Sequence, residues 1–452
     1  METIQAVNLN DSMIQKDVLK RGDPPWLTEL SRAALNAYTN LTWPTTEAEE
    51  WRRTDLSSFD FGKYRVRNEV SGIHAPQLSK AQRGNLTFRG PFVTSHAVPD
   101  HLKSAGGCIE PISIAGLPTN WGAVADIGPL EALIKKNQIL EFDNRVLAWH
   151  YSLWTAGAII SVPPGLHLDE PIIIEYLGNG KSGYNAPHTV VVLGKHSRAN
   201  VIQRFGAGTG ADMMWNAGLQ IALEPGSKLS LTSMQSTGST DTFMQHNHLY
   251  LGQDARLEYV ESLTGGALCK TRTEVHLEGP GSDAQLSGLY IADRGQHIDV
   301  RTVQYHKSHH TQSRAFYRGA VKNGGRTIYQ GLIDVNQDAV GTDAYLTNDN
   351  LILHDDRIDG GIGYGRADSI PSLKIRTNDV KCSHGSTTGK IDDEQLFYLM
   401  ARGIPRKEAR KYLAMGFFEK VIGSVPAEVR DELQSEVDER ITESPHGAPR
   451  GG

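Results

Sequence analysis

Short runs of β-forming residues follow one another from about residue 155 to about residue 353, separated by Gly, Asn, Asp and Ser. No helical pattern interrupts them over about 200 residues. Regular short strands over such a length are typical of a sandwich, a barrel or a β-solenoid. The centres of the later runs lie 11 to 16 residues apart, at Tyr259, Val275, Leu289, Val300, Phe316, Ile328, Val340 and Ile352.

A single stacked solenoid fits this region better than two sandwiches. A sandwich holds ~100 residues, so two of them would need a linker, and no Pro/Ser-rich linker divides the region. Glycine makes up 46 of the 452 residues, which indicates many tight turns. The spacing alone does not choose among the architectures. We therefore predict a mainly β core over 151–390, with a solenoid as the favoured form.

The two flanks of this core are expected to be helical. Residues 1–150 form a mixed, mostly helical region, in which apolar spacing predicts a helix over 25–38. Further helices are expected from a Thr46-x-x-Glu49 capping box through Trp51, and over 126–136.

A C-terminal helical region is predicted over 391–442, followed by a disordered tail over 443–452. Asp392 is placed to cap the first helix, Gly403 to end it and Pro405 to begin the second. A third, acidic helix runs from about Ala427 to Ile441. The second helix is expected to bury one face, made of Ala409, Tyr412, Leu413, Gly416, Phe417 and Val421.

Charge and cysteine content exclude several classes of protein. A formal charge of −6 argues against a nucleic-acid binder, whose binding surface is usually basic. Cys108, Cys269 and Cys382 lie far apart, so neither a disulfide framework nor a Cys-rich zinc site is expected. No apolar run approaches the ~20 residues of a membrane helix. The polar N-terminus lacks an apolar signal core, and we expect a cytoplasmic protein.

Three local motifs carry little weight. Gly180-Lys181-Ser182 resembles the end of a P-loop, but Glu175 occupies the position of the required glycine. Residues 206–211 loosely fit a dinucleotide-binding pattern without a following helix, and we expect a flexible turn there. The histidine cluster at 306–311 predicts a polar rung or turn, with an interface or a weak metal site as the alternative. Motifs of familiar hydrolases are absent from the sequence.

The most informative segment is 378–404, which is predicted to be a last strand followed by a capped helix. Cys382 and His384 are two positions apart, so on a strand both point to one face, about 6.5–7 Å apart. Thiolate and imidazole bind iron and zinc. Two ligands cannot complete a four-ligand site, so the others would come from another segment or another protein. The alternative is that both side chains belong to the core.

This segment closely resembles the SufB/SufD family of iron–sulfur cluster assembly scaffold proteins. Residues 325–335 and the Glu50-Trp51-x-x-Thr54 segment support the resemblance, which is dense over 298–422. The Cys-Ser-His form is more similar to the SufD branch, because the cysteine expected upstream in SufB is missing. A Gly-rich segment at 359–365 is longer than expected and suggests an added loop at a partner interface.

The resemblance implies a right-handed parallel β-helix between helical ends, in a non-catalytic subunit. It implies a complex with a SufB-like paralogue and a SufC-like ABC ATPase, with a transient iron–sulfur cluster forming near the SufB–SufD interface. His384 is the candidate cluster and metal ligand, and Cys382 is its candidate neighbour. The candidate ATPase-docking residues are Phe397, Tyr398, Arg402, Gly403, Ile404, Pro405 and Phe417, and packing against the β-helix is the alternative for the three aromatic residues.

Two other functions stay open from the sequence. One is a SufB-like homodimeric scaffold that holds a cluster by itself. The other is a β-solenoid enzyme, such as a carbohydrate lyase or an acyltransferase, although the clustered charges and hexapeptide repeats of these enzymes are missing. Whether reduced flavin takes part cannot be read from the residues.

Overall fold

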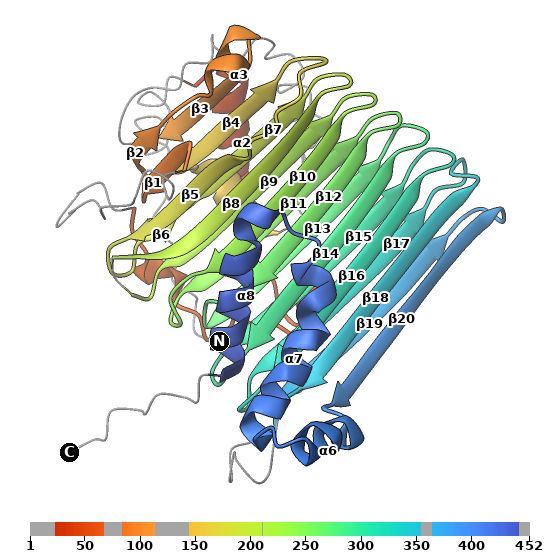
Figure 1. Cartoon of the computed structure of the whole chain (residues 1–452). Helices are drawn as coiled ribbons and strands as arrows, with labels where there is room; N and C mark the ends of the chain where they lie inside the picture. Colours follow the sequence, from red (N-terminus) through yellow and green to blue (C-terminus); the bar gives the residue numbers. More distant parts are fainter. Residues whose placement is uncertain (1–22, 67–83, 114–143, 210, 354–363, 443–452) are drawn as a thin grey trace.

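The computed structural model describes residues 23–66, 84–113, 144–209, 211–353 and 364–442. The helix predicted over 126–136, the Gly-rich segment at 359–365 (except its last two residues) and the predicted disordered tail lie outside these ranges. Within them the chain is mainly β, with helices at both ends (Figure 1).

Parallel strands wind into a flattened solenoid of about seven turns, as expected. Each coil gives one strand to each of two facing sheets, here called the first and second sheets. The first sheet has the order β2-β1-β5-β8-β10-β12-β14-β16-β18-β20, and the second has the order β19-β17-β15-β13-β11-β9-β7-β4-β3. The sandwich and barrel alternatives are therefore wrong.

The strands of the first sheet are β1 (Leu86–Arg89), β2 (Phe92–His96), β5 (Ile172–Asn179), β8 (Arg198–Thr209), β10 (Lys228–Ser236), β12 (Arg256–Leu263), β14 (Asp283–Ala292), β16 (Gln312–Val321), β18 (Thr342–Ile352) and β20 (Val380–Lys390). The strands of the second sheet are β3 (Cys108–Ser113), β4 (Ala156–Val162), β7 (Pro187–Leu193), β9 (Met214–Leu223), β11 (Thr242–Leu251), β13 (Leu268–Leu277), β15 (His297–His306), β17 (Arg326–Val335) and β19 (Arg366–Ile375). A short strand, β6 (Tyr184–Asn185), pairs with β9.

The sequence period is half a coil. Leu268, His297 and Arg326 pair directly across β13, β15 and β17, and they are 29 residues apart each time. Seven of the eight predicted strand centres fall in the seven consecutive strands from β12 to β18. The eighth, Val340, is wrong, because it lies in the turn between β17 and β18 and is 38% exposed. Residues 206–209 also differ from the prediction, since they continue strand β8 instead of forming a turn.

The core runs inside the coil as rows of stacked side chains. Alternate residues of each strand point inward, and the parallel register places an inward residue against its counterpart in the next coil. One such row consists of Val201, Leu231, Tyr259, Leu286, Ala315 and Leu346, all at most 1% exposed.

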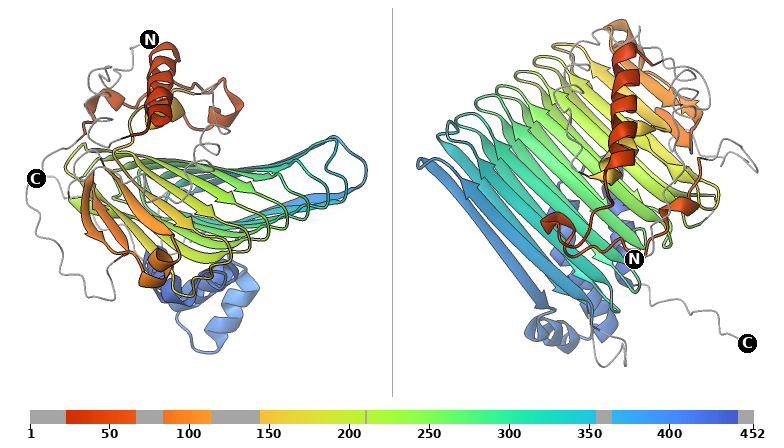
Figure 2. Two further views of the ribbon diagram at one scale, coloured as in Figure 1. Left: turned by 90° about the horizontal axis from the view of Figure 1, so that it is seen from above. Right: turned by 180° about the vertical axis from the view of Figure 1, so that it is seen from behind.

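The N-terminal region covers the outer face of the second sheet (Figure 2). It contains α2 (Pro25–Asn40), η1 (Glu49–Trp51), η2 (Phe61–Lys63), α3 (Asp100–Ser104) and α5 (Arg145–Ser152). The helix predicted over 25–38 is confirmed. The segment through Trp51 is only a single 3-10 turn, and no side-chain hydrogen bond caps it, so the predicted capping box is wrong.

The conserved-looking contact of this region with the solenoid is made by a few charged groups. Arg272 Nη1 lies 3.0 Å from Glu50 Oε2, and the Lys270 ammonium lies 4.6 Å from the centre of the Trp51 ring. Thr54 donates a hydrogen bond to Asp299, which also pairs with Lys270 at 2.7 Å. The Glu50-Trp51-x-x-Thr54 segment therefore fastens the N-terminal region to β13 and β15.

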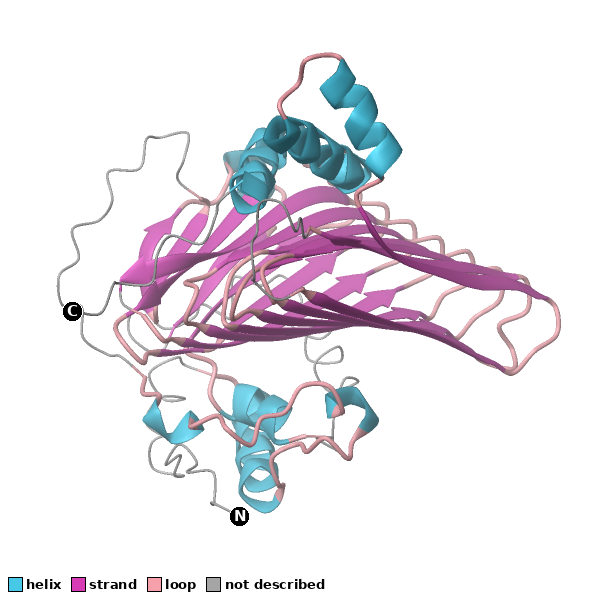
Figure 3. Ribbon diagram, turned by 90° about the horizontal axis from the view of Figure 1, so that it is seen from below, coloured by secondary structure: helices cyan, strands magenta, loops and turns pink. Residues whose placement is uncertain are grey.

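The C-terminal helices cover the outer face of the first sheet (Figure 3). They are α6 (Asp393–Ala401), α7 (Arg406–Ile422) and α8 (Ala427–Thr442). The buried face of α7 is partly different from the prediction: Tyr412 is 56% exposed and Gly416 is exposed, whereas Phe418 is fully buried. The helix has apolar residues on two adjacent stripes, and the position of the sheet decides which stripe is covered.

One carboxyl group lies deep inside the coil. Glu261 on β12 is fully buried and accepts a hydrogen bond of 2.9 Å from the Tyr317 hydroxyl, while its Oε2 has no partner. Burial raises the pKa of Glu261 to about 7, and hydrogen bonds from Tyr317 and Thr271 only partly oppose this effect.

The raised pKa of Glu261 predicts a pH-dependent stability. Between its ordinary pKa of 4.5 and about 7, the unfolded chain loses the proton while the folded chain keeps it. Stability from this group therefore falls as pH rises through that window. Relative to Glu261→Gln, the wild type should lose about 3 kcal/mol of unfolding free energy between pH 4.5 and pH 8. Urea unfolding of both proteins measures it, and an unchanged difference would contradict the prediction.

Candidate functional site

The two predicted ligands lie on the last strand of the first sheet and continue two interior rows. Cys382 pairs with Ala344, and His384 pairs with Leu346, and both partners are buried in the core. The apolar row that runs from Val201 through five further coils thus ends in an imidazole. The prediction that Cys382 and His384 share one face of a strand is confirmed.

The two side chains differ in exposure, because no further coil covers the last strand. His384 is exposed, although its position in the preceding coil is held by the fully buried Leu346. Cys382 is half-buried against the core. Burial raises the pKa of its thiol, and a backbone hydrogen bond at Ala344 opposes this in part. The thiol is therefore mostly protonated until a metal displaces the proton.

The described residues do not complete a metal site at this pair. The one group of three Cys, His, Asp or Glu ligand atoms that converges among them includes neither Cys382 nor His384. Thiol and imidazole suit iron, but a four-coordinate iron needs further ligands. In this arrangement those ligands have to come from another molecule.

The end of the coil is open. Strands β19 and β20 are the outermost strands of their sheets within the described residues, so the outer N–H and C=O groups of each have no neighbouring strand. Leu373 and Ile375 on β19 are 37% and 40% exposed. The sequence analysis did not single out these residues. Their signal is that they are inward-type apolar residues just before the last strand.

The helices beyond β20 present exposed aromatic side chains. Asp392 caps α6, as predicted, by accepting hydrogen bonds from the backbone N–H of Glu394 and Gln395. In α6, Phe397 is 72% exposed and Tyr398 is 56% exposed, so internal packing, the alternative for these two residues, is wrong.

The turn after α6 is shaped by its local sequence. The Arg402 guanidinium lies 4.4 Å from the centre of the Tyr398 ring, and Gly403 adopts a φ of +88°, which a side chain would disfavour. Pro405 then precedes α7 at its N-cap, and Ile404 is half-buried between the two helices.

Phe417 behaves differently from the other predicted docking residues. Its ring lies 4.8 Å from the Arg318 guanidinium, and its carbonyl accepts a hydrogen bond from Arg318 of β16. Phe417 is half-buried and helps to hold α7 on the first sheet, so its alternative of internal packing is the better description.

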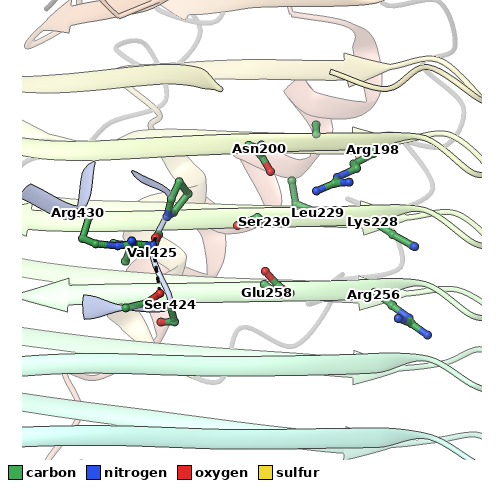
Figure 4. Close-up of a pocket in the computed structure, with 13 residues that line it drawn as sticks. Arg198, Asn200, Lys228, Leu229, Ser230, Arg256, Glu258, Ser424, Val425 and Arg430 are labelled. Atoms are coloured by element: carbon green, nitrogen blue, oxygen red, sulfur yellow. Dashed lines mark hydrogen bonds between the residues drawn. The ribbon is translucent and has the colours of Figure 1, made fainter. Parts of the chain in front are cut away.

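A pocket of about 470 Å³ lies where the turn between α7 and α8 approaches the first sheet (Figure 4). Three exposed cations, Arg198, Lys228 and Arg256, pair in register along one side of it. Arg430 lies on the other side and donates hydrogen bonds to the carbonyls of Gly423 and Val425. The cations are exposed and Glu258 stands among the lining residues, so the pocket by itself does not define an anion site.

The histidine cluster at 306–311 forms the turn between β15 and β16. His306 is buried and bonds Thr311 and Ser313 through its two ring nitrogens, at 2.7 and 2.8 Å. His309 and His310 are exposed at the turn. The predicted polar turn is confirmed. Separately, none of the described helices is both long enough and apolar enough to cross a membrane.

The three thiols should react at different rates in the folded chain. Burial raises the pKa of Cys108 to about 12 and that of the fully buried Cys269 further, whereas Cys382 is half-exposed. Alkylation at pH 8 should therefore modify Cys382 at least roughly ten times faster than the other two. Peptide mass spectrometry measures the rates, and unfolding in urea should equalise them. Equal rates in the folded chain would show that the end of the coil is not open.

Known proteins share this architecture in sequence. Residues 176–417 match the family described as "SUF system FeS cluster assembly, SufBD core domain". An iron–sulfur cluster assembly SufBD family protein of Mycobacterium leprae is 31% identical over 66% of this chain and 76% of its own length. The iron–sulfur cluster assembly protein SufD of Escherichia coli is 30% identical over 90% of each chain. The chain, with its solenoid ending in Cys382 and His384, belongs to the SufBD family of iron–sulfur cluster assembly proteins.

Proposed function

We propose that this chain is a non-catalytic scaffold subunit of SufD type, which helps to form the nascent iron–sulfur cluster at its interface with a SufB-like paralogue. The observation that carries the proposal is the change in two interior rows at the last coil. There Cys382 follows buried Ala344, and His384 follows buried Leu346. Ligand side chains stand where the fold would otherwise place apolar ones.

Iron and sulfide are the cargo of this site. Cys382 and His384 offer one thiolate and one imidazole, a donor set that suits iron. Because no third ligand of the described residues converges on them, the partner has to supply the rest. A site shared between two chains also allows release, since separation of the chains removes part of the ligand set.

The open edge supports a paralogue as the partner. A second parallel solenoid can add its own terminal strands to β19 or β20 and satisfy their outer backbone groups. The same contact would cover Leu373 and Ile375. A second copy of this chain could use the edge in the same way, which is the basis of the homodimeric alternative.

We further propose that a SufC-like ABC ATPase docks on α6 and the following turn. Phe397 and Tyr398 give large exposed aromatic area, and Arg402 adds a cation beside them. Gly403, Ile404 and Pro405 set the angle between α6 and α7. Movement of α6 would reach the solenoid through α7, which packs on the first sheet.

The three free cysteines support a cytoplasmic location for this complex, because a reducing compartment preserves thiols.

Anaerobic reconstitution tests the shared site. With iron, sulfide and its paralogue and ATPase partners, the complex should hold a cluster, measured by absorbance and iron content. Cys382→Ser and His384→Ala should each lower the cluster yield several-fold. Ser386→Ala, an exposed change two positions further along the same strand, should not. A stable stoichiometric cluster on the chain alone would favour the homodimeric scaffold instead.

A double substitution in α6 tests the docking surface. Phe397→Ala with Tyr398→Ala should weaken binding of the SufC-like ATPase at least roughly tenfold, because exposed aromatic residues dominate such interfaces. Calorimetric titration measures the affinity. The fold should survive, since both side chains are largely exposed. Tyr345→Ala, which removes another exposed aromatic group, is the control, and unchanged binding in the α6 variant would refute the proposed surface.

A further inference from the structure

Three ligand side chains converge on the outer face of the second sheet, away from the open end. They are His248 of β11 and Glu274 and His276 of β13, and one ligand atom of each lies within 4.8 Å of the others. All three are buried, with exposed fractions of 8%, 6% and 8%. Two further coils, formed with β15 and β17, separate them from β19.

The register of the solenoid brings these residues together. His248 pairs directly with Glu274, and Tyr250 pairs with His276. Glu274 and His276 are two positions apart on one strand, so they share a face. The signal in the sequence is therefore a His-x-Tyr pair at 248–250 and a Glu-x-His pair at 274–276, which become neighbours only when the 26-residue spacing of this coil is known.

The distances suit a shared ion better than direct hydrogen bonds. The Glu274 Oε2 atom lies 3.5 Å from His248 Nδ1 and 3.7 Å from His276 Nε2. N–H···O hydrogen bonds are usually shorter than ~3.2 Å. Ligand bonds of about 2.1 Å in a tetrahedral zinc site place neighbouring ligand atoms about 3.4 Å apart. The observed spacing is close to that edge length.

Orphaned nitrogens provide an independent observation. Both ring nitrogens of His276 and the Nε2 atom of His248 are buried without a hydrogen-bond partner among the described residues. A buried polar atom without a partner costs about 1–3 kcal/mol. The geometry leaves the Nε2 atom of His276 facing the carboxylate, where an ion could satisfy it.

Neighbouring side chains hold the three ligands in place. Arg272 binds the other carboxylate oxygen of Glu274, with its Nε at 2.8 Å and its Nη2 at 2.6 Å from Oε1. The His276 ring is stacked between Tyr250 and Tyr305, at centre distances of 4.4 and 4.8 Å. Such contacts fix ligand orientation in metal sites. The nearby charge of Arg272 is offset by its ion pair with Glu50.

The protonation states are those that a metal requires. Burial acts to raise the pKa of Glu274, but hydrogen bonds from His248 and His276 and the charge of Arg272 hold it well below its ordinary value. Burial lowers the pKa of His276. The site thus offers an ionised carboxylate and a neutral imidazole without loss of a proton.

We propose that His248, Glu274 and His276 bind one divalent first-row transition ion, Zn²⁺ or Fe²⁺, that links two adjacent coils. Two imidazoles and one carboxylate favour these ions over Ca²⁺ or Mg²⁺, which prefer all-oxygen sites. The ion joins β11 to β13 and, through Arg272 and Glu50, to the N-terminal region. The site is independent of Cys382 and His384.

Zinc content tests the site. The full-length, untagged chain carrying Cys382→Ser and His384→Ala is produced in zinc-supplemented medium, so that metal is present during folding and the terminal pair cannot bind it. Inductively coupled plasma mass spectrometry should find about one zinc per chain. Glu274→Gln and His276→Gln should each lower this at least roughly fivefold. His306→Gln, at another buried histidine with two hydrogen bonds, should retain the zinc.

Two results would overturn the proposal. One is a parent chain with less than about 0.2 zinc per chain, a content far below that of a specific site. The other is a folded Glu274→Gln or His276→Gln variant, as judged by circular dichroism, that keeps the metal. Should these variants fail to fold, X-ray absorption on the parent decides the question. Two imidazoles with oxygen ligands support the site, whereas sulfur ligands or fewer than two imidazoles refute it.

Discussion

In-register stacking of parallel strands is the constraint on which this structure depends. Each coil places its strands against the strands of the previous coil, often 29 residues earlier. The backbone groups of one coil are therefore satisfied by its neighbours, and each inward side chain contacts its counterpart in the next coil. Such an array is stable inside but always leaves its last coil without a partner.

The location of the candidate site follows from that incomplete end. An interior row needs apolar residues only where another coil covers it. At β20 the cover ends, so a thiol and an imidazole can occupy inward positions without the cost of burial that Ala344 and Leu346 avoid in the preceding coil. The same end carries the unpaired strand edges. Ligands and docking edge thus lie together because both result from the termination of one coil.

The two outer faces have different roles. On the first sheet, α7 and α8 form an apolar contact with the solenoid, which leaves α6 exposed at the open end. On the second sheet, the N-terminal region is held by buried charges, including Lys270, Asp299 and Arg272. The histidines and glutamate of the proposed transition-metal site belong to this polar face. A buried polar face can therefore specify how the N-terminal region attaches, whereas an apolar face supplies most of the contact area on the opposite side.

The sequence by itself determined the strand period, the absence of intervening helices, the capped helix after Asp392 and the common face of Cys382 and His384. These are local properties, because spacing and capping depend on residues near one another in the chain. Tertiary structure decided which stripe of α7 is buried, that Phe397 and Tyr398 are exposed while Phe417 packs on Arg318, and that Val340 lies in a turn. It also decided that His248 meets Glu274 and His276 across 26 or more residues. Such contacts depend on the exact length of each coil, which varies from turn to turn and is set only when every strand pairs with its neighbours.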